Sequence, residues 1–156
     1  MRLALVVCVL VSQHQVAAAD DGVSRHLFYG ELLGKAGEYG VGYELALSPR
    51  LALGAAGSFA VVRDQRLATF APYLHLTLLA HHTHALFAEL GAVVTHSKVP
   101  SPVSSWDGMT ATGGGGFASI GYQHATRHLV MRATGSAIVG EGGIGPAVGF
   151  TIGIRP

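Results

Sequence analysis

Cysteine and charge are both scarce in this chain of 156 residues, which has one cysteine and 12% charged residues. The cysteine, Cys8, lies in an apolar run near the N-terminus, so the rest of the chain has no disulfide or thiol chemistry. Soluble domains carry about 25% charged residues, so the low charge and the 49% hydrophobic residues disfavour an ordinary soluble domain. The formal net charge of +1 supplies no basic stripe for phosphates, which argues against nucleic acid as a partner.

Long apolar runs are also missing after the N-terminus. The best later stretch, Tyr73–His96, is interrupted by histidine, threonine and glutamate every few positions. A spanning helix requires about 18 apolar residues in succession. If the chain crosses a membrane, we therefore expect it to cross with strands.

The first 19 residues have the three parts of a secretory signal. Arg2 is a short basic region, Leu3–Val11 is apolar, and Ala17–Ala19 is a small-residue cleavage site. The apolar run reaches about half of a spanning length, which disfavours an uncleaved anchor. We predict a signal peptide over residues 1–19 and one barrel domain over residues 20–156, with no linker.

A two-residue rhythm dominates the remaining chain. In 41–48, Val, Tyr and Leu alternate with Gly, Glu, Ala and Ser, so one face suits lipid and the other a packed polar interior. Segments of about ten to twelve alternating residues are typical of a transmembrane β-barrel. We predict an all-β fold, an eight-stranded antiparallel up-and-down barrel, with strands over 25–34, 39–48, 51–62, 68–79, 85–96, 110–123, 128–139 and 146–155.

The connections between these strands form two sets. Short polar turns at 48–50, 81–84 and 124–128 alternate with connections at 35–38, 63–66, 97–108 and 140–145. An even number of strands places both termini in the periplasm. We expect the first set there and the second set outside the cell.

The alternation also predicts which charged side chains face inward. A basic side chain on the lipid face costs about 2 to 4 kcal/mol at the midplane, so charges belong in the lumen, paired with one another. We predict an ion-paired network that fills the lumen, with Arg132 as the partner of the carboxylates; a small gated pore is the alternative. The predicted members are Glu31, Glu44, His75, Glu89 and Arg132. The facing of strands 25–34 and 110–123 stays open. We expect Gly113–Gly116 either to let the backbone bend or to accept a large neighbour such as Phe87 or Tyr73.

Residues 25–155 resemble the small outer-membrane β-barrel superfamily, the OmpA-like eight-stranded barrels. The resemblance rests on the signal peptide, on strands such as Tyr39–Ser48 and Phe87–Val94, on the Gly-rich segment Gly113–Tyr122 and on the closing strand 147–154. It implies an exported outer-membrane protein. The chain departs from the usual pattern at its end, Ile154-Arg155-Pro156, where such barrels have an aromatic residue.

Enzymatic chemistry is not evident. Leu129–Ser136 is loosely similar to the penultimate strand of lipid A deacylases, in which a histidine base lies two positions before the serine nucleophile. In this chain Thr134 occupies that position before Ser136, so the serine has no adjacent base. A palmitoyl-transferring barrel would need a His, Asp and Ser set, for which the outer loop offers only Asp107, Ser104, Ser105 and nearby His96. We therefore predict no catalytic residue, and keep an exported lipid-binding or lipid A-modifying barrel as a further alternative.

Histidines and glycines form two further patterns. We place His81, His82, His84, His124 and His128 on one periplasmic rim, where they cap the strands. Binding of Zn²⁺ or Cu²⁺ by these imidazoles is the alternative, but no carboxylate or cysteine completes a recognisable spacing, so we predict no metal and no cofactor. Gly140–Gly145 matches G-x-G-x-x-G, but a strand pattern follows it rather than a helix, so we predict a hairpin loop.

The longest outer connection, 97–108, contains Trp106 and Asp107. A tryptophan there suits contact with lipopolysaccharide or an extracellular partner, or the membrane interface. We predict a monomeric, non-enzymatic envelope protein with a structural or interaction role, in contact with outer-membrane lipids and lipopolysaccharide.

Overall fold

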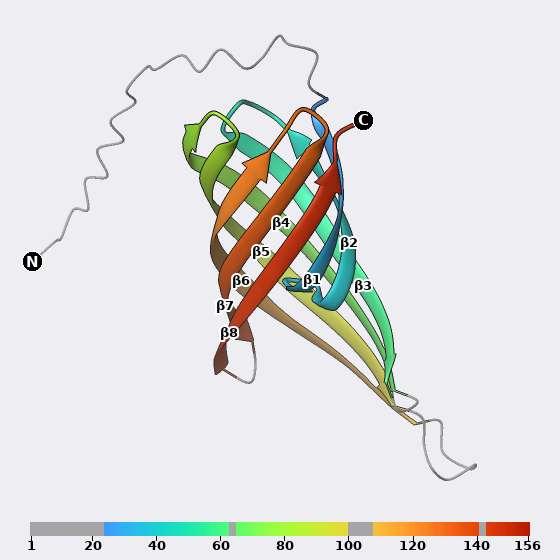
Figure 1. Cartoon of the computed structure of the whole chain (residues 1–156). Coiled ribbons are helices and arrows are strands. Elements are labelled where there is room, and N and C mark those ends of the chain that lie inside the picture. The colour runs from blue at the N-terminus through green and yellow to red at the C-terminus, as the bar shows by residue number, and fades with distance from the viewer. Residues whose placement is uncertain (1–23, 63–64, 100–107, 141–142) are drawn as a thin grey trace, which may run out of the picture.

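The computed structural model describes residues 24–62, 65–99, 108–140 and 143–156. Its strands form one closed barrel in which every neighbour in sequence is a neighbour in space (Figure 1). The described residues contain no helix long and apolar enough to cross a membrane. The eight strands are β1 (His26–Gly34), β2 (Gly37–Ala46), β3 (Leu51–Val62), β4 (Gln65–His81), β5 (His84–Val99), β6 (Met109–Ala125), β7 (Leu129–Gly140) and β8 (Gly143–Ile154).

The predicted fold class is confirmed, and the largest differences lie in strand length. β4, β5 and β6 continue beyond their predicted ends, because residues such as Arg66 and Lys98 pair across β4 and β5. The first three residues of the predicted loop 97–108 therefore belong to β5. All strand pairs are antiparallel, and β8 pairs with β1 to close the barrel.

The two ends of the barrel differ. The N-terminal end of β1 and the C-terminus lie at the end that also carries the three short turns after β2, β4 and β6 (Figure 1). The opposite end carries the connections after β1, β3, β5 and β7. This grouping of connections is the one that the sequence predicts.

Large apolar side chains point outward on every strand. Val41 is 73% exposed, Leu90 65% and Phe70 56%. The facing predicted for β2, β3, β4, β5, β7 and β8 is confirmed, and the structure also settles the two open strands. Leu27, Tyr29 and Glu31 face inward on β1, while Phe117, Ser119, Gly121 and Gln123 do so on β6.

Aromatic side chains fill the lumen opposite glycines. Tyr29 pairs with Gly42, Tyr73 with Gly54, and Phe87 with Gly121. In each pair the aromatic ring occupies the space that a Cβ on the glycine would need. The expectation that Gly113–Gly116 accepts Phe87 or Tyr73 is wrong, because the glycine that receives each ring is its direct cross-strand partner.

The β1–β2 hairpin is the shortest and ends partway along the barrel (Figure 1). Its turn consists of Lys35 and Ala36, both buried. Leu33 adopts a φ of 57°, in the left-handed region that side chains other than glycine seldom adopt, and points outward where the alternation would turn it inward. The change of phase directs Lys35 and Ala36 into the lumen, so the connection lies at the predicted end of the barrel but these two residues are buried.

Candidate functional site

The lumen brings together all five residues of the predicted polar network. They come from five different strands, and each is at most 5% exposed: Glu31 (β1), Glu44 (β2), His75 (β4), Glu89 (β5) and Arg132 (β7). Their inward facing follows from the two-residue period of each strand. The closure of the barrel decides which of these five side chains form ion pairs.

Arg132 binds Glu44 across the lumen. Its Nη1 and Nη2 donate to the two carboxylate oxygens of Glu44, each at 2.8 Å, in the bidentate geometry that makes such pairs strong. Its Nε donates to Oε1 of Gln123 at 2.7 Å. The nearest oxygen of Glu89 lies 3.9 Å from Nη1. Arg132 is therefore a partner of two carboxylates, with Glu44 the closer.

His75 lies between the same two carboxylates. Its Nδ1 is 3.2 Å from Oε1 of Glu89, its cross-strand partner, and 3.8 Å from Oε2 of Glu44. The imidazole ring stacks on Phe87 with a centroid distance of 4.6 Å. This stacking fixes the ring between β2 and β5.

Lys35 is the member that the sequence does not predict. Its Nζ lies 3.0 Å from Oε1 of Glu31 and 3.0 Å from Oε2 of Glu89, and 4.5 Å from the centroid of the Tyr73 ring. Glu31 is thus paired with Lys35, not with Arg132 as expected. A lysine in a turn is ordinarily solvated, and the sequence carries no signal for the positive φ at Leu33 that accompanies its inward position.

Two tyrosines connect these ion pairs. The hydroxyls of Tyr29 and Tyr73 are 2.7 Å apart, and the hydroxyl of Tyr73 donates to Oε2 of Glu44 at 3.1 Å. The polar chain therefore runs from β1 through β4 to the Glu44–Arg132 pair. The sequence predicts Tyr73 only as a side chain that fills space and makes no prediction for Tyr29, because alternation indicates facing and not partners.

The charges of this network nearly balance. The three carboxylates face the basic side chains of Lys35 and Arg132, with His75 as the third basic group. Donor atoms of Glu44, His75 and Glu89 lie within 4.8 Å of one another, close enough for one metal ion. Lys35 and Arg132 already neutralise these carboxylates, so the arrangement favours a filled, cross-linked interior over a cation site.

A small hollow remains at the end that carries the termini. It measures about 60 Å³ and extends from Arg50 and Arg155 at the mouth to Glu44, His75 and Arg132 inside. Burial lowers the pKa of the Arg155 guanidinium, and the charge of Arg132 adds to this effect. Arg50 and Arg155 give this mouth two basic side chains.

The predicted histidine rim forms contacts in pairs. His84 hydrogen-bonds the hydroxyl of Tyr122, and its Nδ1 lies 3.5 Å from Nδ1 of His124. Nδ1 of His128 is 3.4 Å from the carbonyl oxygen of Arg155. Within the described ranges, the only group of three or more potential metal donors is the one in the lumen.

The residues considered for acyl chemistry have other partners. The hydroxyl of Ser136 is 2.7 Å from that of Ser119, and Nδ1 of His96 is 2.9 Å from Oγ1 of Thr112. Several predictions lie outside the described residues: Ser104, Ser105, Trp106, Asp107 and the signal peptide 1–19.

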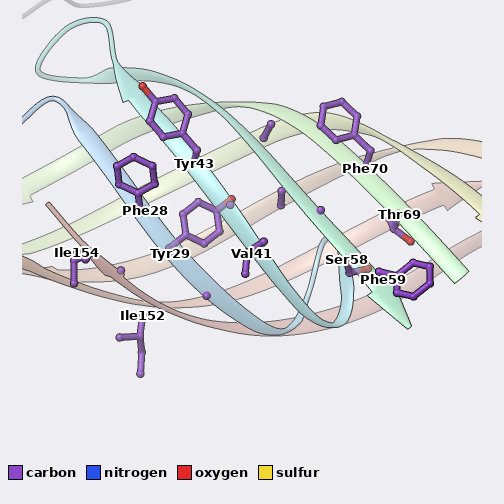
Figure 2. A pocket seen from close by; sticks show the side chains of 16 residues that line it. Phe28, Tyr29, Val41, Tyr43, Ser58, Phe59, Thr69, Phe70, Ile152 and Ile154 are labelled. Atoms are coloured by element: carbon purple, nitrogen blue, oxygen red, sulfur yellow. The ribbon is translucent and has the colours of Figure 1, made fainter. Parts of the chain in front are cut away.

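The outer face of the barrel carries a shallow groove over β8, β1, β2, β3 and β4. Its volume is about 940 Å³. Phe28 and Tyr43 stand at one end, and Phe59 and Phe70 at the other (Figure 2). Gly30, Ala55 and Gly57 lie between these aromatic residues. We call this feature the outer groove.

The closed barrel with outward apolar and inward charged side chains has the fold of the small outer-membrane barrels. The N-terminal β-barrel domain of Pseudomonas aeruginosa OprF superposes with a TM-score of 0.63, at 13% identity, over 84% of this chain and 95% of that one. Ail, the attachment invasion locus protein of Yersinia pestis, superposes with a TM-score of 0.54, at 9% identity, over 83% and 91%. No protein-family profile and no curated protein sequence gives a significant match.

Proposed function

We propose that the protein is a non-enzymatic outer-membrane barrel whose lumen is closed and whose role is structural or interactional in the cell envelope. The observation that carries this proposal is the buried network of Lys35, Arg132 and three glutamates, which cross-links four strands and the first hairpin turn. An eight-stranded barrel encloses space that side chains can fill.

Export and membrane insertion are supported by two features. The outward faces carry exposed Leu, Ile, Val and Phe side chains on all eight strands, a surface that lipid covers better than water. The N-terminal 19 residues have the pattern of a cleaved signal peptide. The short turns and termini would face the periplasm.

Contact with other molecules would occur at the end of the barrel opposite the short turns and the termini. That end carries the connection 100–108 between β5 and β6, within the predicted contact loop 97–108. Ail, which shares the fold, has also been solved in complex with the heparin analogue sucrose octasulfate. Outer-membrane lipids, lipopolysaccharide and an extracellular partner are the contacts we propose for a monomeric chain, with Trp106 and Asp107 in the loop.

A small pore is the second candidate, because five charged side chains lie in the lumen. Two measurements decide between the candidates. Fractionation of expressing cells, with boiled and unboiled samples compared on a detergent gel, tests for a folded barrel in the outer membrane. Single-channel recording in planar bilayers then tests for conduction.

We expect outer-membrane recovery, a heat-dependent mobility shift and no steady channels from the native protein. The double variant Glu89→Gln, Arg132→Ala should conduct more, because it removes the guanidinium that bridges β2 and β7. Recovery in the soluble periplasmic fraction would refute the membrane assignment. Stable channels from the native protein, lost in the double variant, would favour the pore.

A further inference from the structure

Three basic residues lie together on the outward face of β4 and β5. Arg66 and Lys98 are direct cross-strand partners, and His96 lies two residues from Lys98 on the same face. Arg66, His96 and Lys98 are all exposed. We call them the basic cluster.

The pairing of Arg66 with Lys98 is unfavourable by itself. Cross-strand partners have Cβ atoms about 4.5 to 5.5 Å apart, and like charges at that distance destabilise a sheet. Among the described residues no carboxylate forms an ion pair with either side chain. An anion bound between them would remove the repulsion.

The basic cluster adjoins one end of the outer groove. Phe59, a wall of the groove, pairs with Ala68, and Ala68 pairs with His96, so the three residues form one row across β3, β4 and β5. Arg66 is two residues from Ala68 on the same face. A molecule in the groove that extends past Phe59 therefore meets the basic cluster.

The groove itself suits a flexible apolar chain. Gly30, Ala55 and Gly57 are small residues of its floor, Val41 lies in one row between Gly30 and Gly57, and aromatic and branched apolar side chains form its ends. Its volume of about 940 Å³ is within the range of about 300 to 1,000 Å³ that small-molecule sites occupy. It is open to the surroundings of the barrel along the outward face, where a lipid can enter from the side.

We propose that the outer groove and the basic cluster form one binding site for a phosphorylated lipid of the outer leaflet, with an acyl chain in the groove and a phosphate at Arg66, His96 and Lys98. This inference rests on the proposed outer-membrane location and adds a site to it. Arg and Lys both bind phosphate through charge-assisted hydrogen bonds. An apolar groove that ends at paired cations matches a molecule with both parts.

Lipid binding is measured by native mass spectrometry of the detergent-purified barrel. The probes are bis-phosphorylated lipid A and the same lipid with its phosphates removed. We expect Arg66→Ala, Lys98→Ala to weaken binding of the phosphorylated lipid about tenfold and to leave the dephosphorylated lipid unaffected. Gly57→Leu, which fills the floor of the groove, should weaken binding of both lipids.

Each variant has a matched control. Arg50→Ala, Arg127→Ala removes the same charge at the other end of the barrel, and Gly135→Leu adds the same side chain to the outward face of β7. Both controls should bind like the native protein. If the charge control loses as much lipid binding as the site variant, the protein attracts anions in general and the proposed site is refuted. Unchanged lipid binding in both site variants would also refute it. The heat-dependent gel shift verifies folding of every variant and tests the outer-membrane barrel separately.

Discussion

Lys35 joins two carboxylates, of Glu31 and Glu89, that the barrel wall holds on strands β1 and β5. Removing one partner from a buried ion pair is costly, because the remaining charge stays in a place that water does not reach. Lys35 therefore stabilises the barrel in two ways: it attracts the two carboxylates, and it neutralises charges that would otherwise be buried without a partner.

We predict that Lys35→Met lowers the free energy of unfolding by about 3 to 5 kcal/mol, measured by urea titration of the detergent-solubilised barrel with the gel shift as readout. The double variant Glu31→Gln, Lys35→Met should recover part of this loss, since the carboxylate left alone is then neutral. Glu38→Gln changes an exposed carboxyl next to the same turn and is the control. Equal stability of Lys35→Met and the native protein would contradict a buried ion pair.

At the level of the strands, each inward aromatic residue requires its cross-strand glycine. A Cβ on Gly54 would overlap the ring of Tyr73, whose hydroxyl binds Glu44 and Tyr29. We predict that Gly54→Ala destabilises the barrel by about 1 to 3 kcal/mol, because the ring has to leave its hydrogen bonds. Gly145→Ala is the matched control, since a Cβ there meets nothing within 4 Å. A thermal melt followed by the gel shift compares the two.

Alternation is a local property, which is why most strand facings could be predicted from the sequence. The direction of a side chain on β2 or β7 depends only on its own strand. The Arg132–Glu44 pair joins residues 88 positions apart, so it depends on the closed ring. The inward turn at Lys35 depends on one backbone angle at Leu33, which a sequence of otherwise ordinary strand residues does not reveal.

For the whole molecule, the distribution of turns predicts its orientation in the membrane. We expect Thr110→Cys, near the start of β6, to react with a membrane-impermeant maleimide on intact cells. Arg127→Cys, in the turn after β6, should react only after the outer membrane is permeabilised. Labelling in the opposite order would mean that the barrel is inserted the other way round. The lone natural cysteine, Cys8, lies within the predicted signal peptide and so leaves no background thiol in a processed chain.

The interfaces between neighbouring strands of the barrel differ in length. Five residue pairs connect β1 to β8, from Phe28↔Ile154 to Leu32↔Phe150, whereas sixteen connect β5 to β6. The β1–β8 interface also pairs the first strand with the last, and contacts between residues so far apart in sequence form slowly. We therefore expect the β1–β8 interface to form last and to separate first, so that substitutions on β1 and β8 change the unfolding rate more than substitutions in the long hairpins opposite.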